Sequence, residues 1–315
     1  MEAGNGGGKS IAAYILPAAL SAGLFFLAIA APPLAMFAPA PLYYVFAAHG
    51  YKAGVIVSAL LMALVAAAGG ASVAAVYAGS CVVMSISLAW SRFNGDSLEK
   101  TLAKAVLLPF AASFLVVFGA SGFSASGVAG SFSKLSAVSV DSVLESYRQM
   151  NVDQEATAWL SENAAELKSL FARILPSMTF LSAMTMATMN LLAIRAASLR
   201  FGLGVAFANH SLAAFRAPDW MVWGVVAGGA GSMFAEGFAH TIGMNLLICL
   251  SGIYLLQGFA LTHFFFMKAN VHVILRAIGY FVIFSQPPLM LLMSGLGLAD
   301  VWVEFRTRKT EKPEE

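Results

Sequence analysis

Apolar residues follow one another in long unbroken runs along this chain, a pattern typical of helices that lie in lipid. Residues 245–267 form one such run, which has 23 residues and no charged side chain. At a rise of about 1.5 Å per residue, a helix of this length crosses the hydrocarbon core of a bilayer. Similar runs, each of which predicts a helix in the membrane, are residues 11–31, 53–68, 71–90, 105–122, 174–194 and 277–296.

Two further apolar runs are short and contain helix-breaking residues. Residues 34–49 contain two internal prolines, and residues 220–235 are rich in glycine. Proline removes a backbone donor and clashes with the preceding turn. Backbone that breaks at membrane depth is stable only where protein or a wet cavity covers it. We therefore expect both runs to be broken or re-entrant, and we expect the run 277–296 to break near Pro287.

One long polar segment, residues 123–173, separates the fifth predicted span from the sixth. It begins rich in serine and glycine and then places Leu160, Leu167 and Leu170 at helical spacing. Up to residue 170, six acidic residues outnumber three basic ones. We expect one or two amphipathic helices that lie on the outer face of the bilayer or cap the bundle.

The composition agrees with this pattern, since 59% of the 315 residues are hydrophobic and only 11% are charged. A soluble domain carries about 25% charged residues. We therefore predict an all-α, polytopic transmembrane bundle with eight or nine spans, forming a single integral-membrane domain over residues 1–315. A net charge of +2 is too small to indicate a nucleic-acid partner. Cys81 and Cys249 lie inside apolar runs, so we expect packing residues and neither a metal site nor a bound cofactor.

Basic residues in short loops favour the cytoplasm. Lys9, Lys52 and the basic loops at 92–104 and 195–216 predict a cytoplasmic N-terminus, with the acidic segment outside. Six crossings up to residue 194 satisfy this arrangement. The basic tail, residues 300–315, favours the cytoplasm too, but three more crossings would place it outside. The exact number of spans and the side of the C-terminus are left open.

Several polar side chains fall inside the apolar runs, where each costs free energy unless a partner satisfies it. On the 245–267 helix they line an inner face, as a ligand pocket or as hydrogen bonds between helices. Glu236 and His240 are four residues apart and fit a proton relay, a cation site or a solvated turn. The candidate pocket residues are Tyr43, Tyr44, Asn190, Glu236, His240, Asn245 and Gln257.

No set of nucleophile and base, and no cluster of metal ligands, is visible, so we expect a protein that is not an enzyme. The glycines of residues 228–231 lack the Lys-Ser/Thr of a phosphate-binding loop and predict close helix packing. On the first helix, Ala19 and Gly23 are four residues apart, a spacing that lets another helix approach closely. This face is a candidate site for a partner membrane protein.

Three stretches, PDWMVW (218–223), NLL…LLQGFAL (245–261) and GLGLADVWVEFR (295–306), resemble the YybS-like family of uncharacterised bacterial integral-membrane proteins. The resemblance implies an integral-membrane fold in the bacterial cytoplasmic membrane and no particular activity. The resemblance also implies a structural role for the residues of the family motifs, which are Pro218, Trp220, Trp223, Gly258, Asp300, Trp302, Phe305 and Arg306.

The first six predicted helices, in residues 11–122 and 174–194, resemble more loosely the substrate-binding S components of energy-coupling-factor transporters. This chain differs from them in the long outer segment 123–173 and in the C-terminal helices, residues 220–299. The resemblance implies a protein that binds or transports a small molecule, with a pocket near an outer loop. The alternative is a membrane scaffold or assembly partner that transports nothing.

Overall fold

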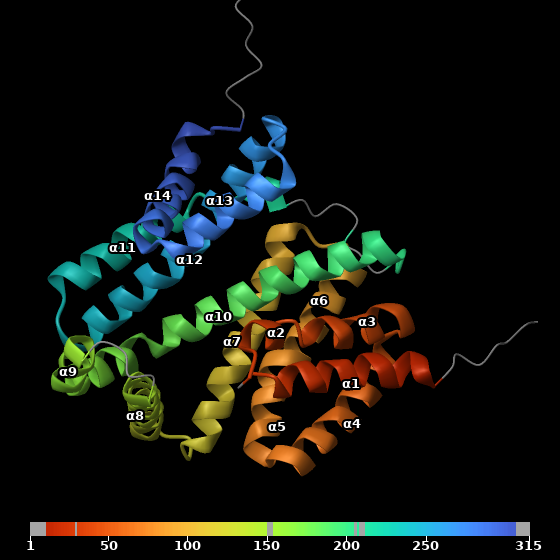
Figure 1. Cartoon of the computed structure of the whole chain (residues 1–315), viewed down its shortest axis with the longest axis horizontal. Helices are drawn as coiled ribbons and strands as arrows, with labels where there is room; N and C mark the ends of the chain where they lie inside the picture. Colours follow the sequence, from red (N-terminus) through yellow and green to blue (C-terminus); the bar gives the residue numbers. More distant parts are fainter. Residues whose placement is uncertain (1–10, 29, 150–153, 205–206, 208–211, 307–315) are drawn as a thin grey trace, which may run out of the picture. The chain divides into compact units, whose positions relative to one another are not determined.

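The computed structural model describes residues 11–28, 30–149, 154–204, 207 and 212–306. Every regular element in these ranges is helical, which confirms the prediction of an all-α chain. The chain divides into two compact units, each described by itself below: unit 1 holds residues 1–123 and 182–209, and unit 2 holds residues 124–181 and 210–315. One helix, α10 (Ala164–Phe201), contributes residues to both (Figure 1).

Unit 1 is built around a short buried helix, α3, which packs against α1, α4 and α6. Gly50 and Gly70 have φ of +85° and +87°, which side chains disfavour, and they turn the chain sharply after α3 and after α4. The elements of unit 1 besides its part of α10 are α1 (Ala12–Phe26), α2 (Pro32–Ala35), α3 (Pro39–His49), α4 (Tyr51–Gly69), α5 (Ala71–Tyr77), a π-helical turn (Ala78–Val82), α6 (Val83–Asn94) and α7 (Leu98–Ala120).

Unit 2 is built around α12, which packs against both α11 and α14. A Cβ atom on Gly258 or Gly297 would collide with the backbone of Met293 or Tyr254, so only glycine lets α12 and α14 approach this closely. The elements of unit 2 besides its part of α10 are α8 (Ala125–Gln149), α9 (Gln154–Glu162), a 3₁₀ turn (Leu212–Ala214), α11 (Met221–Phe234), α12 (Gly237–Lys268), α13 (Val273–Ser285) and α14 (Pro287–Val303).

The predicted packing role of the glycines in residues 228–231 agrees with the structure for Gly228 and Gly231. A Cβ on Gly228 would lie 3.0 Å from the backbone nitrogen of Leu247, and a Cβ on Gly231 would lie 3.3 Å from the Cα of Gly243. These glycines therefore bring α11 against α12 backbone to backbone.

The structure does not confirm eight or nine spans. Among the described residues, five helices are long and apolar enough to cross a bilayer, and the pair α13 and α14, bent by 105°, adds at most one more. The 15-residue α1 reaches only about 22 Å, because it ends at Phe26, five residues before the predicted end. The helices that cross by this criterion are α4, the Ala71–Asn94 stretch, α7, α10 and α12.

Two of the three predicted breaks are present, whereas the run 220–235 forms one continuous helix, α11, so the break predicted there is absent. The run 34–49 divides between α2 and α3, and the last apolar run divides between α13 and α14 at Gln286. The outer segment differs from the prediction, since its end is the first part of α10, a 38-residue helix that continues through the predicted span at 174–194. Its amphipathic placement on the bilayer is not confirmed.

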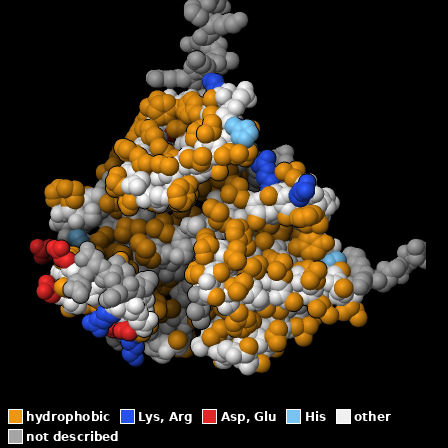
Figure 2. Space-filling view, in the orientation of Figure 1, with side chains coloured by type: hydrophobic (Ala, Val, Ile, Leu, Met, Phe, Trp, Pro, Cys, Tyr) orange, Lys and Arg blue, Asp and Glu red, His pale blue; other side chains and the backbone are white. Residues whose placement is uncertain are grey.

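Apolar side chains cover much of the visible surface (Figure 2). Leu16, Leu60 and Leu115 are 73%, 67% and 69% exposed on α1, α4 and α7. Leucines exposed on several helices fit lipid as the surrounding solvent and support a membrane location.

Candidate functional site

The chain breaks between α2 and α3 in the core of unit 1, and this break leaves a backbone carbonyl without its helical donor. Pro39 has no N–H, and the N–H of Ala40 donates to Phe37 O at 3.1 Å. The carbonyl of Met36 therefore receives neither of the bonds that a regular helix would give it. Asn190 Nδ2 on α10 donates to Met36 O at 2.7 Å instead.

Two serines satisfy the neighbouring carbonyls. Ser21 Oγ on α1 donates to Ala38 O at 2.7 Å, and Ser85 Oγ on α6 lies 2.9 Å from Pro39 O. The hydroxyl of Tyr77 lies 2.8 Å from Ser21 Oγ. We name Ser21, Tyr77, Ser85 and Asn190 the break cluster. All four side chains are 0% exposed, so the broken backbone is covered by protein as the prolines predict.

The π-helical turn between Tyr77 and Ser85 helps to bring both residues to the break. On a regular helix, residues eight positions apart point about 80° away from each other. A π-helical turn has more residues per rotation than an α-helix, so each residue turns by a smaller angle and the two side chains point in more similar directions. The wide turn over Ala78–Val82 therefore lets one continuous stretch present both hydroxyls to the same broken segment.

The predicted pocket residues Tyr43 and Tyr44 lie on α3 and are not members of the break cluster. Tyr43 is fully buried, and its ring stacks on that of Phe207 with centroids 5.8 Å apart. The half-buried Tyr44 meets the ring of His49 edge-on at 6.1 Å. Of the three candidates in unit 1, only Asn190 belongs to the break cluster.

Asn245, a predicted pocket residue in unit 2, is inserted into the hydrogen-bond ladder of α10. Its Oδ1 accepts from the N–H of Ser177 at 2.9 Å, and its Nδ2 donates to Arg173 O at 2.8 Å. In a regular helix these two backbone groups would bond to each other, and Pro176 lies between them. The amide of Asn245 thus bridges two backbone groups of α10 beside a proline, so this residue forms hydrogen bonds between helices, the second of the two predicted roles.

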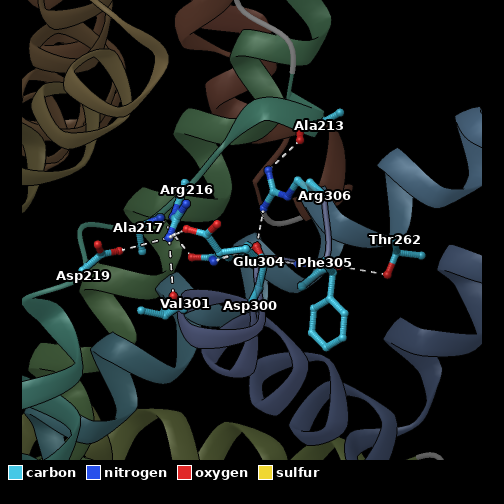
Figure 3. Close-up of polar contacts among 12 residues, drawn as sticks. Ala213, Arg216, Ala217, Asp219, Thr262, Asp300, Val301, Glu304, Phe305 and Arg306 are labelled. Carbon is cyan, nitrogen blue, oxygen red and sulfur yellow. Dashed lines mark hydrogen bonds and ion pairs between the residues drawn. The ribbon is translucent and has the colours of Figure 1, made fainter. Parts of the chain in front are cut away.

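A second buried polar group lies where α14 ends (Figure 3). Gln257, which is 0% exposed, accepts from the N–H of Ala217 at 2.9 Å and donates to Asp300 Oδ2 at 3.1 Å. The same carboxylate pairs with Arg306 at 2.9 Å, and Arg306 also donates to Ala213 O at 2.7 Å. We name Gln257, Asp300 and Arg306, with the backbone of Ala213 and Ala217, the C-terminal clamp.

An exposed set of charges lies beside the C-terminal clamp (Figure 3). Arg216 pairs with Glu304 at 3.1 Å and with Asp219 at 3.6 Å. The N–H of Phe305 donates to Asp300 Oδ1 at 3.1 Å, which helps to fix the chain after α14. These contacts tie residues 213–219 to the exit of α14.

Glu236 and His240 are not brought into a shared site. Glu236 is exposed at the start of α12, His240 is half-buried, and neither a hydrogen bond nor an ion pair joins them in the described structure. Within the same residues, no group of three or more His, Cys, Asp or Glu side chains is placed to hold a metal ion. Cys81 and Cys249 are both free thiols.

The basic loop between α6 and α7 carries one strongly paired acid. Lys104 Nζ lies 2.5 Å from Asp96 Oδ2 and 4.3 Å from the ring centroid of Trp90. The hydrogen bond from Lys104 holds the pKa of Asp96 below its usual value. This loop lies between the two apolar helices α6 and α7.

Comparison with known protein families identifies the family of this chain. The family model for the predicted membrane proteins called DUF2232 matches residues 19–301. The chain belongs to the DUF2232 family. Neither the search of curated proteins nor that of solved structures found a match.

In this DUF2232 chain, the residues of the C-terminal sequence motifs divide into two groups. Asp300, Phe305 and Arg306 take part in hydrogen bonds of or beside the C-terminal clamp, and Gly258 allows α14 to approach α12. The others are exposed: Pro218, and Trp220, Trp223 and Trp302, at 69%, 75% and 65%. Exposed tryptophans fit the aromatic belt at a membrane interface.

Sequence reasoning missed three of the four residues of the break cluster. Ser21, Tyr77 and Ser85 are single polar groups inside apolar runs, and nothing in their spacing identifies a common partner. The available signal was Pro39, which predicts carbonyls in need of donors from other helices. It also missed Ala217, because a backbone N–H gives no trace in a sequence.

Proposed function

We propose that this DUF2232 chain binds a small polar solute within unit 1 and serves as the binding subunit of a membrane transport system. The observation that carries the proposal is Asn190 Oδ1, which is buried beside a broken helix and receives no hydrogen bond within the described residues. A buried polar atom without a partner costs about 1–3 kcal/mol. A solute or a water that donated to it would recover that cost.

Two further features support binding in the membrane. Transporters commonly hold solutes where a membrane helix is discontinuous, because the freed backbone groups and nearby side chains face inward. In unit 1 the discontinuity between α2 and α3 meets side chains from three other elements of the membrane bundle. The proposal assigns no catalytic step, metal or cofactor to the chain.

Thermal unfolding of the purified full chain in detergent tests the proposal. A ligand that binds only the folded protein raises its melting temperature. We expect members of a panel of small polar solutes to do so for the wild type and to lose the effect in Asn190→Leu. The matched control is Asn245→Leu, which also removes a buried asparagine but should keep the ligand effect. A panel without any hit, or hits that Asn190→Leu leaves unchanged, would contradict the proposal.

We place the protein in the bacterial cytoplasmic membrane with its N-terminus in the cytoplasm. Basic residues gather between α6 and α7 and at the end of α10, as the positive-inside rule requires of cytoplasmic ends. A cysteine at position 141 in α8 should react with an impermeant maleimide in intact cells. A cysteine in place of Lys52 should react only after lysis, and the opposite result would reverse the orientation.

A partner protein is the second candidate function, carried by α1. Ala19 and Gly23 are exposed there, and a Cβ added to Gly23 would meet no atom within 4 Å. This small-residue face is open to another membrane helix. Gly23→Leu should abolish recovery of a stoichiometric partner in mild detergent, whereas Asn190→Leu should leave it intact. A chain that is recovered alone in both cases would argue against a partner.

A further inference from the structure

The orientation of the Asn190 side-chain amide is fixed by its surroundings. Its nitrogen donates to Met36 O and to Met186 O, both at 2.7 Å. The flipped amide would point an oxygen at these two carbonyl oxygens, which would repel it. The Oδ1 atom therefore occupies the other branch of the amide, where it has no donor among the described residues.

The hydroxyl protons of the break cluster are already used. Ser21 has one proton and donates it to Ala38 O, so the contact between Ser21 and Tyr77 must be a donation from the tyrosine. Ser85 has one proton for Pro39 O and Cys81 O, at 2.9 and 2.7 Å. Every donor of the four side chains is therefore committed, whereas an acceptor remains.

The charge of the break cluster agrees with this count. No lysine, arginine or histidine bonds to any of its four side chains in the described part of the chain. A carboxylate or phosphate placed beside Asn190 Oδ1 would face a second acceptor in surroundings that cannot hydrate it. The C-terminal clamp differs in this respect, because its buried group without a hydrogen-bond partner is a donor, Arg306 Nε, and not an acceptor.

We infer that the solute donates an N–H or O–H hydrogen bond to Asn190 Oδ1, so that the site accepts uncharged donors such as amides and alcohols and rejects carboxylates, phosphates and ammonium ions. The inference rests on the proposed function and adds the chemical class of the ligand. Asn190 is then the residue that determines specificity, whereas Ser21, Tyr77 and Ser85 hold the broken backbone in place.

Three probes of similar size test the inference on the purified full chain: propionamide, propylammonium chloride and sodium propionate at equal ionic strength. A ligand at ten times its dissociation constant raises the ratio of folded to unfolded protein about 11-fold. We expect propionamide to raise the melting temperature of the wild type, and propionate and propylammonium to leave it unchanged. Asn190→Leu should abolish the propionamide shift, and the Asn245→Leu control should retain it.

A second variant covers the case in which Asn190→Leu does not fold. Asn190→Asp keeps an acceptor at the same position and adds negative charge, so propylammonium should stabilise it more than propionamide does. A propionate shift that equals the propionamide shift and disappears in Asn190→Leu would overturn the donor class but leave solute binding in place. The absence of a shift with all three probes would overturn the inference, and the wider solute panel would then decide the proposed function separately.

Discussion

Gln257 should be the most costly single amide to remove from unit 2. Gln257→Leu keeps the volume and loses both hydrogen bonds, so the N–H of Ala217 is left buried without an acceptor. That orphaned group costs about 1–3 kcal/mol, and the lost bond to the carboxylate of Asp300 costs about 1.5–3 kcal/mol. The apolar leucine recovers about 1 kcal/mol by burial. The free energy of unfolding should therefore fall by about 1.5–5 kcal/mol.

Asn245→Leu is the matched comparison, because it removes another buried amide from the same helix. The two backbone groups that Asn245 bridges belong to residues 173 and 177 of α10, which are spaced to bond to each other when the amide is gone. Its cost should therefore stay near the range of about 0.6–2 kcal/mol for hydrogen bonds between membrane helices.

Equilibrium unfolding in mixed detergent micelles, followed by circular dichroism, measures both variants against the wild type. The two variants differ in whether the freed backbone groups can find a new partner. A cost for Asn245→Leu that exceeds that of Gln257→Leu would refute this expectation, as would a Gln257→Leu variant within about 0.5 kcal/mol of the wild type.

Three further predictions concern other contacts. Asp300→Ala should lower the free energy of unfolding by about 3–5 kcal/mol, since it removes a buried carboxylate that pairs with the half-buried Arg306 and accepts from Gln257, and a loss below about 1 kcal/mol in the same unfolding assay would contradict this. Gly258→Ala should prevent α12 and α14 from packing and lower the melting temperature sharply, whereas Gly229→Ala, which meets no atom within 4 Å, should be neutral or slightly stabilising. The lowered pKa of Asp96 means that its contribution to stability is present above about pH 4 and is lost as the pH falls through the folded-state value. Asp96→Asn should remove this acid-dependent loss of melting temperature. If the melting temperature of the variant depends on pH as that of the wild type does, Asp96 makes no such contribution.

The breaks of the bundle were predictable from single residues, because proline acts locally. Pro39 and Pro287 remove donors wherever they occur, so the interruptions between α2 and α3 and between α13 and α14 follow from sequence. The ends of helices were less predictable. Residues 27–31 are as apolar as the rest of their run, yet α1 ends at Phe26, since apolar composition does not determine where a helix stops.

The partners of the candidate polar residues could not be predicted at all. The sequence shows that Gln257 and Asn245 need partners, but those partners include the backbone groups of residues 217, 173 and 177, which any amino acid would supply. The break cluster had the same difficulty, because its side chains come from three separate segments of the chain and its main acceptors are carbonyls.

The amide of Asn245 has a mechanical consequence for the helix that receives it. One turn of α10 is completed by a side chain of α12, so the register of these two helices is locked at that point. If α12 slides along or rotates about its own axis, it must either open two hydrogen bonds of α10 or carry the Pro176 turn with it. A proline that would otherwise weaken α10 thereby becomes the point at which movement of one helix is transmitted to the other.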